Sequence, residues 1–244
     1  MKRLVLSLSL GLVAAPAAAE PTRLMVRAQS TDAKFIGTSM GGVQVIVRDA
    51  RSKKILAKGA ITGGTGDTAR LVIEPRRRGD VASDDESAGF EAFLDITEPT
   101  LVQVEAFGPM GKPGAAITVA SSLWVLPGRH LTGDGLILTF PGLVVEADLI
   151  SGDAGLSVRA KVTLMCGCPL EPGGTWNAAN YTVTARLMSG QAEVARSTLA
   201  FASKPSEFAG TLSGVPKGKY TLQVTAADRT TINTGVGEKS VQVP

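Results

Sequence analysis

The strongest constraint on the fold of this chain is a two-residue period of apolar side chains. Three segments show it clearly, with apolar residues at every second position and polar residues between them: 43–47, 181–187 and 220–226. Because successive side chains of a β-strand point to opposite faces, this pattern predicts strands with one buried face. After the first 19 residues, no window of twelve shows the apolar spacing and caps of a helix, so we expect helices of a single turn at most.

Further segments favour strands, bounded by turns rich in Gly, Asp and Pro: 22–29, 54–61, 69–74, 90–96, 100–107, 116–125, 135–140, 143–150, 155–166, 191–201, 208–212 and 238–243. Short strands at this spacing are typical of sandwiches or barrels. They are too many for one ordinary sandwich in a chain of 244 residues. We therefore expect an all-β protein of two consecutive antiparallel β-sandwich domains, residues 20–141 and 142–244, joined at Pro141-Gly142.

The first 19 residues have the pattern of a signal peptide. Lys2 and Arg3 precede an apolar run over 4–15, and three alanines at 17–19 offer a cleavage site before Glu20. No later apolar run reaches the ~20 residues that a membrane-spanning helix needs. The sequence thus predicts an exported protein, periplasmic or secreted, without a transmembrane segment after signal removal, in a compartment where disulfides persist.

Charge and composition exclude several function classes. The 25 basic and 22 acidic residues give a net charge of +3, and two of the basic residues lie in the signal peptide, so a nucleic-acid binder of the basic-patch kind is disfavoured. One histidine and two cysteines cannot build a multi-histidine zinc site or a blue-copper site from one protomer. His130 alone does not define a catalytic triad, and a polar turn residue is the simpler interpretation. We therefore expect a non-enzymatic module with a protein partner in the periplasm or at the cell surface.

A polar stretch interrupts the first predicted domain. Pro75 to Gly89 contains three consecutive arginines, 76–78, and then Asp84-Asp85-Glu86, with scarcely an apolar residue. The acidic run lacks the alternating spacing of a calcium-binding loop. We interpret the stretch as a mobile, solvated loop.

Two segments resemble known β-sandwich families. The run 41–49, followed by a polar turn and 54–59, resembles the opening hairpin of transthyretin-like domains, as in carboxypeptidase regulatory modules. The run 218–228, followed by Asn233-Thr234-Gly235 and a last strand, resembles the closing strands of bacterial immunoglobulin-like domains. These resemblances imply sandwiches that display loops or dock partners, and they supply no catalytic residues to transfer.

The two cysteines form a compact motif, Met165-Cys166-Gly167-Cys168-Pro169, followed by a Pro/Gly-rich loop that carries Trp176. Apolar residues occupy the even positions 156–164 of the strand before it. Continuing that alternation places Cys166 and Cys168 on the core side and Met165 outside. Pro169 cannot donate to a ladder and should end the strand. The motif is then expected at the rim of the second sandwich.

Three interpretations of the cysteine pair stay open. Two thiolates at a strand end suit copper(I) or another soft metal, the only cofactor that the sequence suggests. In the second interpretation the pair forms a thiol-disulfide redox couple, for which Gly167 must bend the chain because alternate residues of a strand lie too far apart. In the third interpretation, that of a purely structural partner-docking protein, the cysteines fill the edge of a core.

Overall fold

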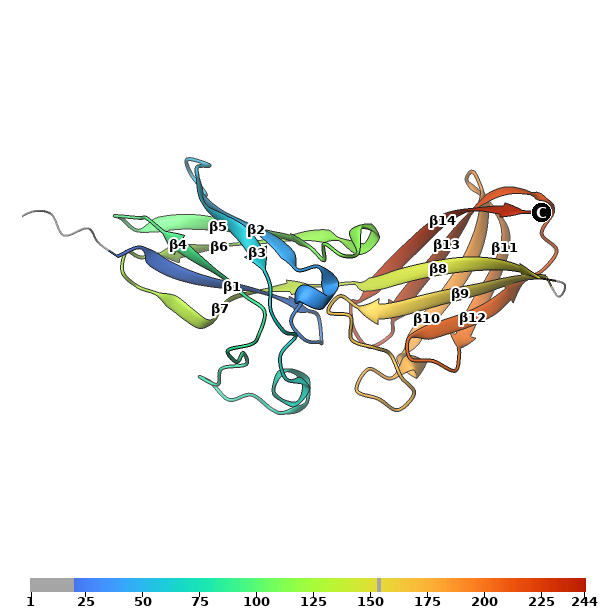
Figure 1. Ribbon diagram of the computed structural model, residues 1–244, viewed down its shortest axis with the longest axis horizontal. Coiled ribbons are helices and arrows are strands. Elements are labelled where there is room, and N and C mark those ends of the chain that lie inside the picture. Colours follow the sequence, from blue (N-terminus) through green and yellow to red (C-terminus); the bar gives the residue numbers. More distant parts are fainter. Residues whose placement is uncertain (1–19, 153–154) are drawn as a thin grey trace, which may run out of the picture.

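The computed structural model describes residues 20–152 and 155–244, and it shows two β-rich halves placed end to end (Figure 1). We refer to residues 20–140 as the N-terminal half and to residues 143–244 as the C-terminal half. Each half has its own cluster of buried apolar side chains. The prediction of an all-β fold built from antiparallel sheets is confirmed.

The N-terminal half is a sandwich of two sheets. One sheet has the order β4-β1-β7 and the other β3-β2-β5-β6. All pairings are antiparallel except that of β1 with β7, which is parallel. The strands are β1 (Thr22–Ser30), β2 (Val43–Asp49), β3 (Ile55–Ile61), β4 (Phe90–Leu94), β5 (Thr100–Gly108), β6 (Ile117–Val125) and β7 (Leu131–Phe140).

The predicted alternation decides which face of each strand is buried. On β2 the valines at 43, 45 and 47 are no more than 1% exposed, whereas Gln44 between them is exposed. Their neighbours Val102, Val104 and Ala106 on β5 are fully buried. Burying each such side chain contributes roughly 1.5–3 kcal/mol for valine-sized residues, so the inward-facing rows hold the two sheets together.

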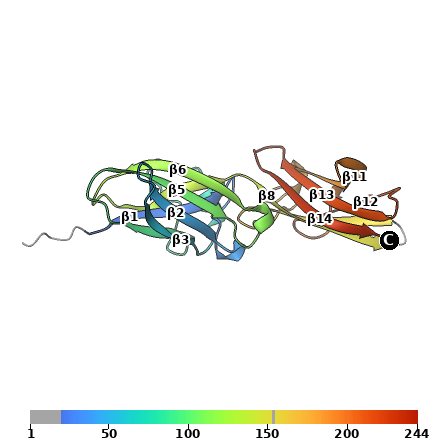
Figure 2. The ribbon, with the colours of Figure 1, turned by 90° about the horizontal axis from the view of Figure 1, so that it is seen from above.

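The C-terminal half is one seven-stranded antiparallel sheet with the order β14-β13-β10-β11-β12-β9-β8. The sheet folds over so that its first and last strands, β14 and β8, lie side by side (Figures 1 and 2). Gly235 on β14 permits this approach, because a Cβ there would collide with the carbonyl oxygen of Leu143. The strands are β8 (Leu143–Gly152), β9 (Gly155–Leu164), β10 (Tyr181–Ser189), β11 (Ala192–Phe201), β12 (Glu207–Leu212), β13 (Gly218–Asp228) and β14 (Thr234–Val243).

One predicted strand is wrong. Residues 69–74 form instead a single helical turn, η2 (Ala69–Ile73). Asp67 begins this turn: its side chain accepts from the backbone N–H of Arg70 at 2.8 Å, and its carbonyl accepts from the N–H of Leu71 at 3.1 Å. A capping carboxylate therefore overrides a strand-like run of apolar residues. The other helical segments in the described chain are also single turns: η1 (Thr38–Met40), η3 (Pro113–Ala115) and η4 (Ala178–Asn180).

Candidate functional site

The cysteine motif forms a tight turn immediately after β9. The strand ends at Leu164, so the prediction that it continues to Pro169 is wrong. The N–H of Gly167 donates to the carbonyl of Leu164 at 2.8 Å, and Gly167 has a φ of +82°. The chain then doubles back, and Pro169 forms an isolated bridge with Thr163. Gly167 thus bends the chain, and the Cα atoms of Cys166 and Cys168 lie 5.5 Å apart.

Both cysteine side chains are buried, as the alternation predicts. Cys166 is 2% exposed and Cys168 is 5% exposed, and both belong to the apolar cluster of the C-terminal half. Their sulfur atoms adjoin each other in the arrangement of a disulfide. In the described part of the chain, no group of three or more His, Cys, Asp or Glu side chains is placed to hold a metal ion. A soft metal held by the two sulfurs alone therefore stays a prediction.

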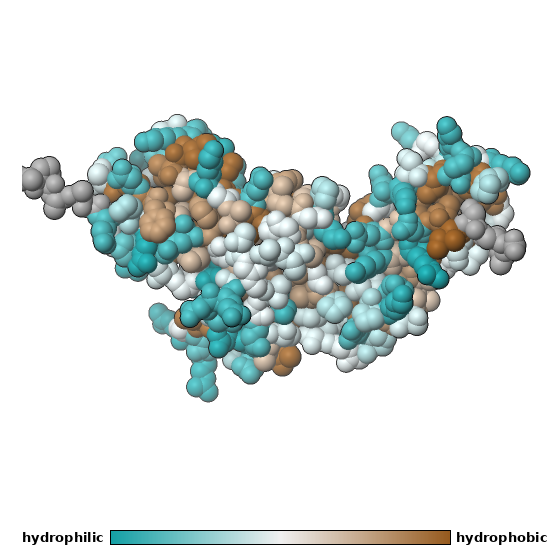
Figure 3. Space-filling view, in the orientation of Figure 1, coloured by the Kyte–Doolittle hydropathy of each residue, from teal (hydrophilic) through white to brown (hydrophobic). Residues whose placement is uncertain are grey.

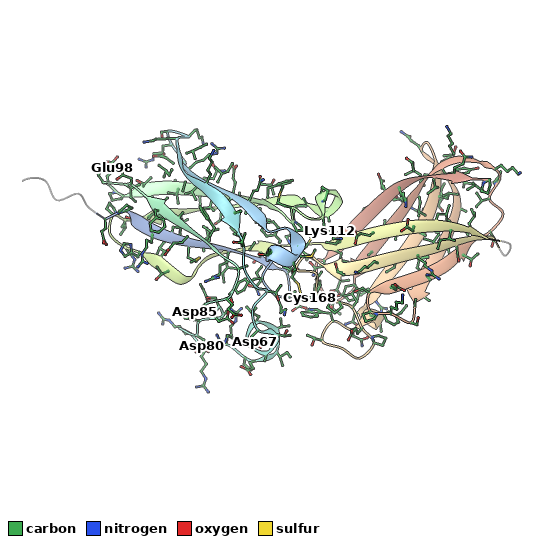
Figure 4. All side chains as sticks on the ribbon, viewed as in Figure 1. Asp67, Asp80, Asp85, Glu98, Lys112 and Cys168 are labelled. Atoms are coloured by element: carbon green, nitrogen blue, oxygen red, sulfur yellow. A yellow bond between two sulfur atoms is a disulfide. The ribbon has the colours of Figure 1, made fainter. Side chains whose placement is uncertain are left out.

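Met165 corrects the predicted placement of this motif. It does not face solvent but is 1% exposed and packs in the apolar cluster of the N-terminal half. Met40, which ends η1 in that half, also reaches the turn: a Cβ on Gly167 would lie 2.7 Å from its Sδ. The motif lies at the junction of the two halves, where Cys168 is seen in Figure 4. Alternation correctly separated Met165 from the cysteines, but it could not show that the other half covers that face.

Asn233 is a second residue at the junction, and its side chain is fully buried. Its amide nitrogen donates to the carbonyl of Thr31 at 3.1 Å, and its amide oxygen accepts from the N–H of Gly142 at 2.9 Å. The N–H of Thr31 in turn donates to the carbonyl of Phe140 at 2.9 Å. One side chain therefore ties the C-terminal half to both a loop of the N-terminal half and the joint at Pro141-Gly142.

The loop after the cysteines contacts the N-terminal half as well. The indole N–H of Trp176 donates to the carbonyl of Asp32 at 2.8 Å. Burial raises the pKa of Asp32, and the charge of Asp228 adds to this effect. For Asp228 burial acts in the same direction, but hydrogen bonds from Thr230 and Thr231 outweigh it and lower its pKa. These groups add polar contacts to the junction, whereas Met40 and Met165 contribute apolar ones.

A long segment between β3 and β4, Thr62–Gly89, projects from the N-terminal half, and Figure 4 labels Asp67, Asp80 and Asp85 on it. Arg27 on β1 holds the end of this segment. Its side chain is 5% exposed and donates to the carbonyls of Ser87 at 2.6 Å, Ala88 at 2.8 Å and Gly133 at 3.1 Å. Burial lowers the pKa of Arg27, and Asp134 and Asp84 oppose this shift.

Asp134, on β7, holds the middle of the same segment. Its carboxylate accepts from the N–H groups of Ala82 at 2.9 Å and Ser83 at 2.8 Å. Ala82, Ser83, Ser87 and Ala88 are all buried. The prediction of a solvated loop over 75–89 is therefore wrong for 82–83 and 87–88, where side chains of the sandwich hold the backbone, although residues 75–81 and 84–86 are exposed.

The anchored segment borders a cleft of about 550 Å³. Arg27 lies in its wall, and carboxylates from two parts of the chain surround it, namely Asp84, Asp85, Glu86 and Glu91. Ser87 and the N–H of Glu86 bond to the Asp84 carboxylate, with distances of 2.6 Å and 3.2 Å. These hydrogen bonds lower the pKa of Asp84 although burial opposes them, so the carboxylate shapes the loop.

The remaining predicted residues have local roles in the described structure. His130 accepts a hydrogen bond at Nδ1 from the N–H of Arg23 at 3.1 Å. Pro169 is exposed, and Trp176 is partly buried against the core of the C-terminal half. Sequence reasoning missed Arg27, Asp134 and Asn233, because a single polar residue in a strand or turn carries no signal of what it will bond to.

Comparisons with known proteins leave the family open. No family model matches the chain, and no curated protein matches it. Among solved structures, the chain is similar to the chicken interferon gamma receptor alpha chain, at 12% sequence identity and a TM-score of 0.37. That alignment covers 93% of this chain and 100% of the receptor chain. Within residues 20–152 and 155–244, no helix has the length and apolar character needed to span a membrane.

Proposed function

We propose that this protein is an exported, non-enzymatic binding or accessory module that docks a protein partner in the periplasm or at the cell surface. The observation that carries the proposal is the segment Thr62–Gly89. It places 28 residues between β3 and β4, which are consecutive in the chain, whereas connecting segments longer than about 12–15 residues are uncommon in compact domains and often functional. Buried anchors hold its base, so the segment is displayed in a defined position.

The tip of the segment has the composition of a contact surface. Arg76, Arg77 and Arg78 are all exposed, and Ile73 and Val81 beside them are 63% and 53% exposed. Arginine is enriched at protein interfaces, and exposed apolar side chains beside it gain free energy when a partner buries them. An anchored base with an exposed tip also lowers the entropic cost of ordering the loop on binding.

Site-specific crosslinking in the native compartment tests this proposal. A photoreactive side chain at Arg77 is expected to give discrete crosslinked species, and one at Lys217, in an exposed turn of the C-terminal half, is expected to give none. Replacing Arg76, Arg77 and Arg78 together by Ala should abolish the species formed from a crosslinker at Val81. Equal crosslinking from Arg77 and Lys217, or none from Arg77, would contradict the proposal.

The cysteine turn supports a second candidate function, the binding of copper(I) or another soft metal. Reduction of the pair frees two thiolates in a buried turn, and copper(I) accepts two sulfur ligands whereas zinc needs four ligands. Cys166 and Cys168 would hold the ion, and the surrounding apolar side chains would exclude water. The alternative function of the same two cysteines is that of a redox couple. In it the dithiol reduces glutathione disulfide to two glutathione thiols and forms the Cys166–Cys168 bond.

Titration of the reduced protein with copper(I) against a competing chelator separates these uses. A metal site is expected to bind about one copper(I) per chain, and Cys166→Ser or Cys168→Ser should each abolish tight binding. A redox couple is expected to reach equilibrium with glutathione, measured by thiol trapping. If neither occurs, the pair is structural, and the double Cys→Ala variant should lose roughly 1–3 kcal/mol of stability through smaller buried side chains.

A further inference from the structure

A second surface with a distinct composition lies at the end of the β2–β3 hairpin. We define the hairpin patch as Arg51, Lys53, Lys54 and Ile55 of the hairpin, with Trp124 and Leu126 from the end of β6. The guanidinium carbon of Arg51 lies 5.2 Å from the centroid of the Trp124 ring. Trp124 pairs with Leu101 on β5, and the N–H of Ala50 donates to the Leu101 carbonyl at 2.8 Å. Backbone and side-chain contacts thus join the hairpin to β5 and β6.

The turn of the hairpin is held by Asp49. Its carboxylate accepts from the N–H groups of Arg51 at 2.7 Å and Ser52 at 2.9 Å. These hydrogen bonds lower the pKa of Asp49, with the backbone bond from Ser52 as the largest cause. The carboxylate is therefore ionised at neutral pH and is occupied by the backbone of the turn. The positions of the lysines that follow are set by this turn.

The cations of the patch are not neutralised by ion pairs. Arg51, Lys53 and Lys54 are exposed, and none of the three makes a salt bridge within the described chain. Besides Asp49, Glu98 lies at the same end of the N-terminal half (Figure 4). Exposed ion pairs do form elsewhere, as between Lys112 and Glu146 at 2.8 Å. The hairpin patch therefore presents positive charge that a negatively charged partner would complement.

Apolar side chains stand beside these cations. Ile55 is 47% exposed, Trp124 is 52% exposed and Leu126 is 45% exposed. The space-filling view shows brown apolar residues bordered by teal hydrophilic ones at this end of the molecule (Figure 3). Single exposed apolar residues need no explanation, but three such residues next to three unpaired cations form a mixed surface.

We propose that the hairpin patch binds the surface of a membrane that contains anionic lipids. Lysine and arginine near such a surface each contribute about 1 kcal/mol through attraction to the lipid charge. Tryptophan favours the boundary between headgroups and acyl chains, and aliphatic side chains beside it gain by partial burial there. The turn between β2 and β3 projects from the upper side of the N-terminal half in Figure 1, so a flat surface can reach it.

Vesicle sedimentation tests the proposal with the full exported chain. Vesicles of phosphatidylcholine with phosphatidylglycerol are expected to bind the protein, and vesicles of phosphatidylcholine alone to bind it at least tenfold more weakly. Lys53→Gln with Lys54→Gln should weaken binding to the anionic vesicles about tenfold or more, since each lysine contributes about fivefold. Lys217→Gln with Lys219→Gln is the matched control, because it removes two exposed lysines of the C-terminal half, one just before β13 and one at its start.

Tryptophan fluorescence supplies an independent readout. The chain has two tryptophans, and the vesicles should shift the emission of the wild type and of Trp176→Phe, but not that of Trp124→Phe. The proposal is overturned if the two lysine pairs weaken binding equally, if anionic vesicles do not bind, or if Trp124→Phe retains the shift. Preferential binding to an acidic polypeptide such as polyglutamate would also overturn it, in favour of a protein partner.

Discussion

Two irregular segments of this protein are held in place by opposite means. Thr62–Gly89 in the N-terminal half is polar, and a buried arginine and a carboxylate bind its backbone. The turn at Met165–Cys168 in the C-terminal half is apolar, and it is fixed because its side chains enter the cores of both halves. Side-chain polarity alone therefore does not show whether a loop is free, since hydrogen bonds to the backbone hold a polar loop equally well.

The largest expected effect comes from removing the buried anchor of the polar segment. Arg27→Met should lower the free energy of unfolding by about 3 kcal/mol, because the carbonyls of Ser87, Ala88 and Gly133 would lose charged donors inside the protein. Denaturant unfolding measures the change. Arg27→Lys should recover only part of the loss, since an ammonium cannot reproduce the planar fork.

Arg23→Met is the matched control for Arg27→Met. Arg23 lies on the same strand, but its side chain is 45% exposed and its contact with Glu91 is 3.5 Å. An exposed ion pair of this kind contributes about 0–1 kcal/mol. Equal destabilisation by the two substitutions would show that Arg27 does not anchor the segment.

A smaller effect is expected at the junction of the halves. Asn233→Ala should lower the free energy of unfolding by about 2 kcal/mol, since the partly buried N–H of Gly142 and carbonyl of Thr31 would lose their partner. Asn177→Ala is the control: Asn177 caps η4 within the C-terminal half, so its loss should cost about 1 kcal/mol without loosening the junction.

Denaturant unfolding, which measures the effect of Asn233→Ala, also tests the division at Pro141-Gly142. That division stays a prediction. Residues 20–141 and 142–244 are each expected to unfold cooperatively when produced alone, but with lower stability because Val144 and Met165 pack in the N-terminal cluster and Ala33 in the C-terminal one. If Asn233→Ala destabilised the isolated C-terminal half as much as the whole chain, its role would lie within that half and not at the junction.

The strands were predictable because their signal is repeated. Alternation over five or more residues identified β2, β10 and β13 and the buried face of β9. Continued past the end of β9, it also predicted that both cysteines are buried. Single interactions over long sequence distances were not predictable. Arg27 bonds to residues 60 and 106 positions away, and Asn233 to one 202 positions away. The two sites therefore differ in kind: the cysteine motif is visible in the sequence, whereas the anchors of the long segment depend on the fold.

The smallest expected effect is a pH dependence confined to the polar segment. Burial opposes the ionisation of Asp134, but hydrogen bonds from Ala82 and Ser83 and the charge of Arg27 outweigh it and lower the pKa of the carboxyl below its ordinary value of 3.8. A group with a lowered pKa in the folded state stabilises the protein above the unfolded pKa, and the stabilisation is lost as the pH falls through the folded value. We therefore expect the backbone amide signals of Ala82 and Ser83 to change in NMR spectra only below about pH 3.8.

Asp134→Asn should remove this titration and lower the free energy of unfolding by about 1 kcal/mol. The amides of Arg51 and Ser52, which bond to Asp49 in the hairpin, should titrate as before in that variant. A pH response of Ala82 and Ser83 that persists in Asp134→Asn would show that another group holds the segment, and the contrast between its anchors and the apolar cysteine turn would lose its basis.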